Sequence, residues 1–134
     1  MRLISSDGRR IVDVGAGNIW KSVYSTVISC LGRKRKDFLL AYSFLETGNC
    51  DGKNGYMVAR QINLIRDELS RYAPDKAVYD IDNLQITPPW KGNISPVVTS
   101  CANFFTTADG KDLFYEIVSI LCYAEVTNTY IVAE

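Results

Sequence analysis

Residues 86–110 limit the possible folds most, because they read ITPPWKGNISPVVTSCANFFTTADG. Three prolines in this stretch argue against a continuous helix, since proline lacks a backbone N–H and clashes with the preceding turn. Trp90 and the pair Phe104 and Phe105 make it too apolar for a solvated linker. We therefore expect an ordered connection that packs on the core, with these three aromatic residues as its anchors.

Three segments have the apolar spacing of amphipathic helices. Hydrophobic residues recur every three or four positions over residues 18–31, 56–72 and 110–125. Gly32 follows the first segment and Pro74 follows the second, and both residue types commonly stand just beyond a helix end. The sequence therefore predicts three main helices.

Other runs are rich in β-branched and aromatic residues, which favours strands. These runs are residues 10–14, 37–45, 75–84, 97–105 and 126–133. Residues 37–45 also fit a short buried helix, but their aromatic content favours a strand. Residues 46–55, rich in glycine and asparagine, predict a loop. The expected fold class is α+β, a single domain over residues 1–134 whose three helices pack on a small, mainly antiparallel sheet.

Charge is balanced over the whole chain, with 15 basic and 15 acidic side chains. No net field therefore favours nucleic acid or an anionic membrane as a partner. The balance is uneven along the chain: residues 1–37 carry eight Lys or Arg against three Asp, and residues 38–134 carry seven against twelve Asp or Glu. An acidic surface in the second part is the expectation.

The chain has no histidine, and its four cysteines are widely spaced without a Cys-x-x-Cys pair. This composition argues against a zinc site and against histidine-based acid–base catalysis. The start, MRLISSDGRR, lacks the apolar stretch of a signal peptide, and no apolar run approaches the length of a membrane span. We expect a cytoplasmic protein with free thiols and predict no catalytic residues, no metal site and no cofactor.

A strand, the turn Gly15-Ala16-Gly17 and a helix follow one another near the start of the chain. Residues 12–18 resemble the first motif of S-adenosylmethionine-dependent methyltransferases, whose glycines let the backbone approach the cofactor. Ile19 and Trp20 stand where that motif has a third glycine, and regular alternation of strands and helices does not follow. A methyltransferase-like cofactor binder is the alternative function, and a structural subunit of a larger assembly is a third.

Several short blocks in the second part of the chain carry a family pattern. They are residues 59–70, 74–80, 88–95 and 99–103, followed by the helical segment 106–123. Together they resemble a family of bacterial immunity proteins from polymorphic toxin systems, contact-dependent growth inhibition included, namely the immunity protein 70 family. The resemblance covers about residues 55–125.

The resemblance implies a small cytoplasmic antidote rather than an enzyme. Such a protein binds the C-terminal toxin domain of a cognate effector and blocks its active site or its access to substrate, without a cofactor, nucleic acid or small-molecule ligand. Where the toxin is a nuclease, an acidic surface would imitate the phosphate backbone, although the neutral net charge fits a nuclease poorly. The expected toxin-binding residues are Asp75, Asp80, Asp82, Trp90, Lys91, Asp109 and Asp112.

Overall fold

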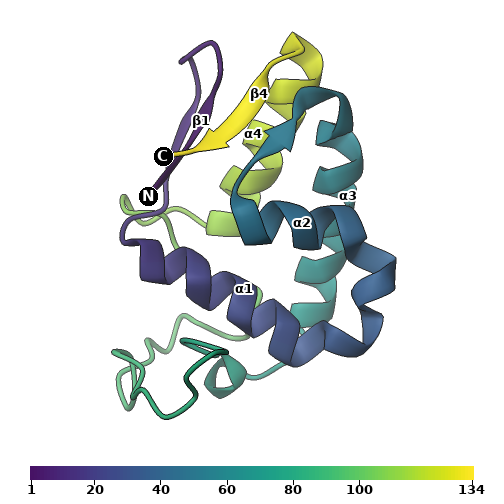
Figure 1. Cartoon of the computed structure of the whole chain (residues 1–134). Coiled ribbons are helices and arrows are strands. Elements are labelled where there is room, and N and C mark those ends of the chain that lie inside the picture. Colours follow the sequence, from purple (N-terminus) through teal and green to yellow (C-terminus); the bar gives the residue numbers. More distant parts are fainter.

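The computed structural model describes residues 1–134 as an α+β fold, in which helices pack beside a small antiparallel sheet (Figure 1). Three helices have 15 residues each: α1 (Gly17–Leu31), α3 (Gly55–Leu69) and α4 (Leu113–Thr127). The shorter α2 (Leu39–Thr47) follows a 3₁₀ helix, Gly32–Phe38. The predicted fold class and the three main helices are confirmed.

The sheet has four short strands in the order β2-β1-β4-β3, and every neighbouring pair is antiparallel. The strands are β1 (Arg2–Ser5), β2 (Ile11–Asp13), β3 (Cys50–Asp51) and β4 (Tyr130–Ala133). The two ends of the chain therefore lie side by side on β1 and β4 (Figure 1). The strands expected within 10–14 and 126–133 are present as β2 and β4. The sequence did not indicate β1, because its residues, RLIS, include only one β-branched side chain.

The hydrophobic core lies where α3 meets α4, α2 and α1. Val58, Ile62, Ile65 and Leu69 form one buried seam along α3, which is the seam that the spacing predicts. α4 is buried on a broader face, from Leu113 to Ala124. Its broad apolar face places it between α3 and the sheet.

The strand predicted over residues 37–45 is wrong. The structure has the 3₁₀ helix and α2 there, with Phe38, Ala41, Tyr42 and Leu45 buried at helical spacing. Gly48 ends α2 in the left-handed conformation (φ 74°) and donates its N–H to Phe44 O at 2.6 Å. Such a glycine cap is typical of the end of an α-helix.

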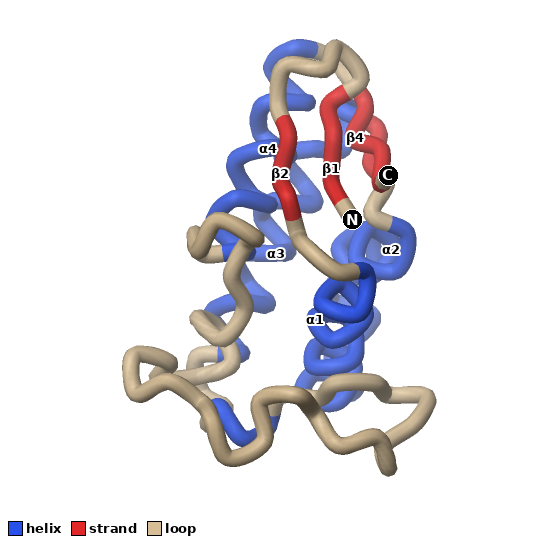
Figure 2. Tube along the Cα trace, turned by 90° about the vertical axis from the view of Figure 1, so that its left-hand side faces the viewer, coloured by secondary structure: helices blue, strands red, loops and turns tan.

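The strands predicted over residues 75–84 and 97–105 are also wrong. Both lie in the α3–α4 connection, residues 70–112, whose only regular element is the 3₁₀ helix Pro74–Lys76. Figure 2 shows this connection as a long tan stretch that crosses the molecule below α1. Asn103 Oδ1 accepts hydrogen bonds from the N–H groups of Thr99 and Ser100 at 3.0 and 3.1 Å. Such local side-chain bonds satisfy the backbone in turns and replace a strand ladder.

Two helix boundaries differ in detail from the sequence pattern. Gly32 has φ −56°, a right-handed helical conformation. It is the first residue of the 3₁₀ helix Gly32–Phe38, so the chain stays helical after α1. α4 begins three residues later than expected, because Asp112 is its N-cap and accepts the Tyr115 N–H at 2.9 Å.

Candidate functional site

The α3–α4 connection is fixed to α1 by three buried hydroxyl groups. Ser22 Oγ donates to Val78 O at 2.6 Å, and Thr26 Oγ1 accepts the Val78 N–H at 2.9 Å. Ser25 Oγ accepts the Ile81 N–H at 2.9 Å. All three side chains are fully buried, so these bonds form away from competing water. Sequence reasoning missed these residues, although Ser22, Ser25 and Thr26 have the spacing that places them on one face of α1.

Two exposed contacts add to this attachment. Asn18 Nδ2 donates to Tyr79 Oη at 2.5 Å, and Lys21 forms an ion pair with Asp82. The hydrogen bond to Asp82 raises the pKa of Lys21. The first turns of α1 thus determine where residues 78–82 lie.

Aromatic side chains hold the middle of the connection. Trp90 packs edge-to-face on Tyr79 at 5.6 Å and on Phe104 at 5.0 Å, measured between ring centroids. Phe104 in turn contacts Phe105, which is buried. Trp90 is itself half-buried against the core, so the predicted anchoring by these aromatic residues is confirmed.

Beyond these anchors the connection exposes three large aliphatic side chains. Leu84, Ile86 and Val97 are 71%, 42% and 77% exposed. Leu84 and Ile86 line a small hollow of about 150 Å³, which also includes Tyr79 and Asp80. Sequence reasoning missed all three, because an apolar residue in a packed segment is normally expected to face inward.

The structure places the predicted site residues in two groups. Asp75, Asp80, Asp82, Trp90 and Lys91 lie in the first half of the connection, which passes below α1. Asp80 Oδ1 accepts the Asp82 N–H at 2.9 Å, whereas the carboxylate of Asp75 is exposed and makes no hydrogen bond.

Asp109 and Asp112 form the second group, where the connection returns to the sheet and Ala108 donates its N–H to Asp13 O at 2.9 Å. Asp112 caps α4 and pairs with Arg66 at 3.3 Å. Asp109 accepts a hydrogen bond from the Thr107 hydroxyl, which lowers the pKa of Asp109. Both carboxylates therefore have structural partners within the chain.

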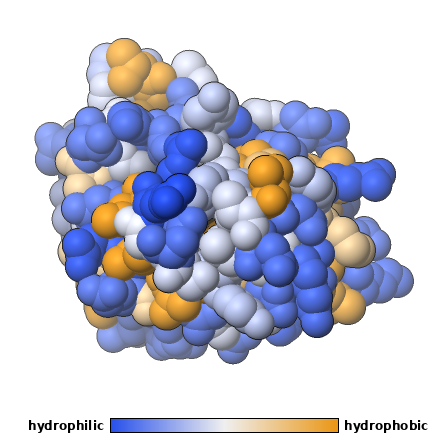
Figure 3. Space-filling view, turned by 90° about the horizontal axis from the view of Figure 1, so that it is seen from above, coloured by the Kyte–Doolittle hydropathy of each residue, from blue (hydrophilic) through white to orange (hydrophobic).

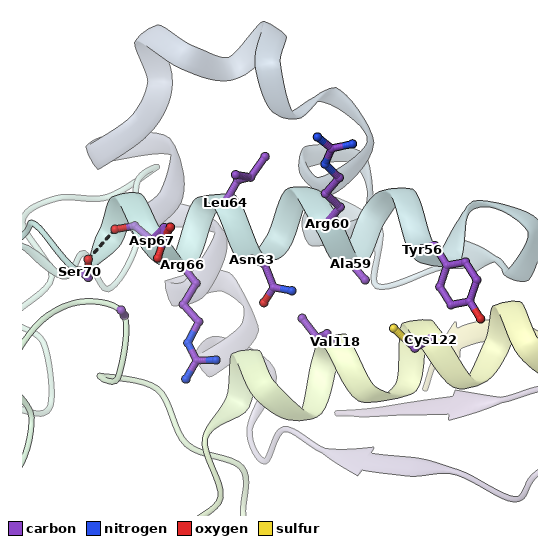
Figure 4. A pocket seen from close by; sticks show the side chains of 11 residues that line it. Tyr56, Ala59, Arg60, Asn63, Leu64, Arg66, Asp67, Ser70, Val118 and Cys122 are labelled. Atoms are coloured by element: carbon purple, nitrogen blue, oxygen red, sulfur yellow. Dashed lines mark hydrogen bonds between the residues drawn. The ribbon is translucent and has the colours of Figure 1, made fainter.

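A second concave surface lies between α3 and α4, with a volume of about 680 Å³. Figure 4 shows Asn63, Val118 and Cys122 between the two helices, whereas Arg60 and Leu64 point away from α4. The polar groups that line this surface include the amide of Asn63, the thiol of Cys122, the carboxylate of Asp67 and the guanidinium groups of Arg60 and Arg66.

Neither a metal site nor the methyltransferase-like turn finds support in the geometry. No group of three or more Cys, Asp or Glu side chains comes together. β2, which precedes Gly15, is an edge strand of an antiparallel sheet, whereas the cofactor motif follows a strand of a parallel sheet.

The rest of the surface is mostly polar. Seen from the end opposite the connection, hydrophobic side chains appear as separate small patches among hydrophilic ones (Figure 3). None of the helices has both the length and the apolar character needed to cross a membrane. Other exposed aliphatic residues lie on the sheet and the helices, among them Ile11, Leu39, Val126 and Val132.

Comparison with known proteins gives one match. A family model described as immunity protein 70 matches residues 6–132, which extends the resemblance noted over residues 55–125 to nearly the whole chain. The search of curated proteins and the search of solved structures found no match to this chain.

Proposed function

Because the chain belongs to the immunity protein 70 family, we propose that it binds and neutralises the cognate toxin domain of a polymorphic toxin system, such as a contact-dependent growth inhibition effector. Neutralisation would occur in the cytoplasm by blocking the active site of the toxin domain or its access to substrate. The protein would act by binding alone, without catalysis or a cofactor.

The α3–α4 connection supports this proposal most directly, and we assign it as the toxin-contact surface. Its exposed Leu84, Ile86 and Val97 provide apolar area of the kind that forms the centre of a protein–protein interface. Hydrogen bonds to α1 fix the backbone at Val78 and Ile81, shortly before Leu84 and Ile86 in the chain. A segment that is ordered before binding loses less conformational entropy when the complex forms.

Charged residues flank these apolar residues in the sequence, and we propose that they form the rim of the interface. Asp75, Asp80 and Asp82 precede Leu84, and Lys91 lies between Ile86 and Val97. Asp75 is exposed and unpaired, so it is available to a basic toxin surface. Such rim charges mainly steer association and select the partner, whereas the apolar contacts supply most of the affinity. Asp109 and Asp112, which have partners in the chain, would contribute less.

The function is tested by expressing the protein together with the toxin domain encoded immediately upstream of its gene. We expect restored growth and a stoichiometric complex in size-exclusion chromatography. Isothermal titration calorimetry with purified components then gives the dissociation constant. Continued growth arrest, together with no complex, would contradict the proposed function.

The contact surface is tested separately with matched double variants. Leu84→Asp with Val97→Asp should weaken toxin binding by about 100-fold, because two apolar contacts are replaced by desolvated carboxylates. The control is Leu39→Asp with Val126→Asp, which changes the same residue types at positions that are 59% and 71% exposed outside the connection. The control should bind within about 3-fold of the wild type. Equal weakening by both pairs would place the contact surface elsewhere while leaving the function intact.

A further inference from the structure

The sheet has one face that no helix covers. Leu3 and Ile131 are buried on the inner face, which lies against α4. Because side chains alternate along a strand, their neighbours Ile4 and Val132 point to the opposite, outer face. Figure 2 looks onto this outer face, with β2, β1 and β4 in front and α4 behind them.

The outer face carries a continuous apolar row. Ile4 on β1 lies directly opposite Ile11 on β2 and Val132 on β4 in the register of the sheet. Side chains in such pairs have Cβ atoms about 4.5–5.5 Å apart, so the three residues of this apolar row form one surface. Tyr130, the next outward residue of β4, extends the row to an outer patch of four residues. Ile11, Tyr130 and Val132 are 53%, 56% and 49% exposed.

This composition differs from that of an ordinary solvent-facing sheet. The open face of an antiparallel sheet usually presents polar residues at its outward positions. A single exposed apolar side chain is common, but adjacent ones rimmed by charged residues are typical of a surface that another protein covers. The outer patch therefore indicates an interface.

Charged residues lie at one end of this face, beside the apolar row. Arg2 is directly opposite Asp13 on β2 and forms an ion pair with Glu134 at 2.8 Å. All three are exposed, and Asp13 and Glu134 give this end of the face an acidic balance.

Arg9 gives the opposite end of the face a positive charge. It lies in the exposed turn between β1 and β2. The guanidinium group of its neighbour Arg10 lies over the ring of Tyr123 on α4, 5.0 Å from the centroid, which places Arg10 on the inner side. Because successive side chains alternate, Arg9 points to the outer side.

We propose that the outer patch is the interface of a homodimer, in which the sheets of two copies stack face to face. A two-fold axis along the apolar row lets each side chain of the row pack on its own copy. The same rotation brings the charged ends together, so that Asp13 lies opposite the partner's Arg9. The face is thus complementary to itself in charge as well as in apolar character.

The other way of stacking two such faces is unfavourable. A two-fold axis parallel to β1 would place Arg2 over the partner's Arg2 and Asp13 over the partner's Glu134. Like charges would then repel each other on both sides of the axis. The charge pattern therefore selects the antiparallel arrangement of the two β1 strands.

The size of the face predicts a weak dimer. With four strands about 4.8 Å apart and five residues along β1 at about 3.4 Å each, it measures roughly 19 by 17 Å. Two such faces together would remove on the order of 1,000 Å² from solvent, at the lower end for specific interfaces. We expect a dissociation constant of about 10–100 µM.

The outer patch and the α3–α4 connection lie on different parts of the molecule. Figure 2 shows the sheet at the upper end of the view and the connection at the lower end. A dimer through the outer patch leaves Leu84, Ile86 and Val97 of both copies exposed. The inference does not rest on the proposed function, so either can fail without the other.

The test is sedimentation velocity of the purified chain from about 5 to about 500 µM, a range that spans the expected dissociation constant. The mass should rise with concentration from 15.0 kDa towards twice that value. A mass that stays at 15.0 kDa at every concentration would overturn the proposal.

A matched pair of double variants locates the interface. Ile11→Thr with Val132→Thr removes apolar atoms from the outer patch and keeps the β-branched shape that favours a strand. Its dissociation constant should rise by about 10-fold or more. The control, Leu39→Thr with Val126→Thr, changes residues that are 59% and 71% exposed on helices and should dimerise like the wild type. Circular dichroism checks the fold of each variant, and undiminished dimerisation of Ile11→Thr with Val132→Thr would overturn the proposal.

Arg9→Glu tests the orientation without changing a strand residue, because it places a like charge opposite Asp13 of the partner subunit. It should weaken the dimer by about 5-fold or more at low salt and by less at about 0.5 M salt. Arg60→Glu on α3 changes the net charge equally and should leave the dimer unchanged. Equal effects of the two substitutions would overturn the proposed stacking.

Toxin binding distinguishes a second copy from the toxin as the occupant of the outer patch. The variant Ile11→Thr with Val132→Thr should bind the toxin domain as the wild type does. Loss of toxin binding by this folded variant would show that the toxin covers the outer patch, and would overturn the assignment to a second copy.

Discussion

Asp7, in the turn between β1 and β2, accepts three hydrogen bonds. Ser5 Oγ and the Arg9 N–H donate to Oδ1 at 2.6 and 3.0 Å, and Tyr123 Oη donates to Oδ2 at 2.5 Å. The bond from Ser5, followed by those from Tyr123 and Arg9, lowers the pKa of Asp7 from 3.8 to about 2. The contact with Tyr123 ties the β1–β2 hairpin to α4.

This shift predicts a specific loss of stability in acid. Because the folded-state pKa lies below the unfolded value, the contribution of Asp7 is present above pH 4 and is lost as the pH falls towards 2. Asp7→Asn should therefore be less stable than the wild type at pH 5, and the difference should shrink between pH 4 and pH 2. Urea denaturation at several pH values measures it.

Tyr123→Phe provides the graded comparison, because it removes one of the three donors and keeps the carboxylate. Its pH dependence should lie between those of the wild type and Asp7→Asn. A constant difference between Asp7→Asn and the wild type over the whole range would contradict this role.

At the residue scale, the sequence predicted that the connection is ordered and anchored by aromatic residues, but it did not predict which of its aliphatic side chains are exposed. Trp90 and the aspartates are conspicuous in a printed sequence, since large aromatic or charged residues stand out. The exposure of Leu84 and Val97 depends on the tertiary fold, which decides the direction of each side chain. The hydrogen bond between Tyr123 and Asp7 could not be predicted from the sequence either, because the two residues lie near opposite ends of the chain.

At the scale of the elements, periodicity predicted the long helices and failed for short or locally bonded segments. α3 has four seam residues in one unbroken pattern, so its helix was evident. α2 has only nine residues, and such a short apolar run fits a helix and a strand equally well. Its helical state is decided by packing on α3 and α1, which no local pattern records.

The corner between β3 and α3 depends on Gly52. A Cβ at this position would lie 2.1 Å from Thr129 O and 2.5 Å from Ala124 O. Ala124 O also accepts the N–H groups that end α4, so this backbone cannot move aside without losing its cap. Gly52→Ala should therefore lower the free energy of unfolding by about 3 kcal/mol and the melting temperature by about 10 °C.

Gly32→Ala is the matched control for Gly52→Ala, because no atom lies within 4 Å of its Cβ and its φ is −56°. It should be neutral or stabilising by up to about 1 kcal/mol. Thermal melts of both variants show whether a loss of stability in Gly52→Ala comes from the close packing at Gly52 or whether replacing a glycine by alanine is destabilising in general. An unchanged melting temperature for Gly52→Ala would show that the corner can open.

At the scale of the whole molecule, the strands, the helices and the α3–α4 connection contribute unequally to the core. The buried hydrophobic cluster draws on all four helices and the sheet, but within the connection only on Ala77, Cys101, Ala102 and Phe105, all near its ends. Local stability follows the density of buried contacts, so the middle of the connection should open at a lower free energy than the helices. A surface that binds a partner is commonly drawn from such a region.

The two tryptophans allow the opening of the connection to be measured against unfolding of the core. Trp20 is 6% exposed and packs edge-to-face on Phe44, whereas Trp90 reports on the connection. Trp20→Phe leaves Trp90 as the only indole, and this change also removes a buried Nε1–H that has no hydrogen-bond partner. Trp90→Phe leaves only Trp20.

In urea, the fluorescence transition of Trp20→Phe should have a midpoint roughly 0.5 M or more below its own circular dichroism transition, because Trp90 is released first. The fluorescence and circular dichroism transitions of Trp90→Phe should coincide, because Trp20 is exposed only when the helices unfold. Comparing two signals within each variant removes any effect of the substitution on global stability. Coincident transitions in both variants would mean that the connection and the core unfold as one cooperative unit, with the α1 hydroxyl bonds strong enough to join them.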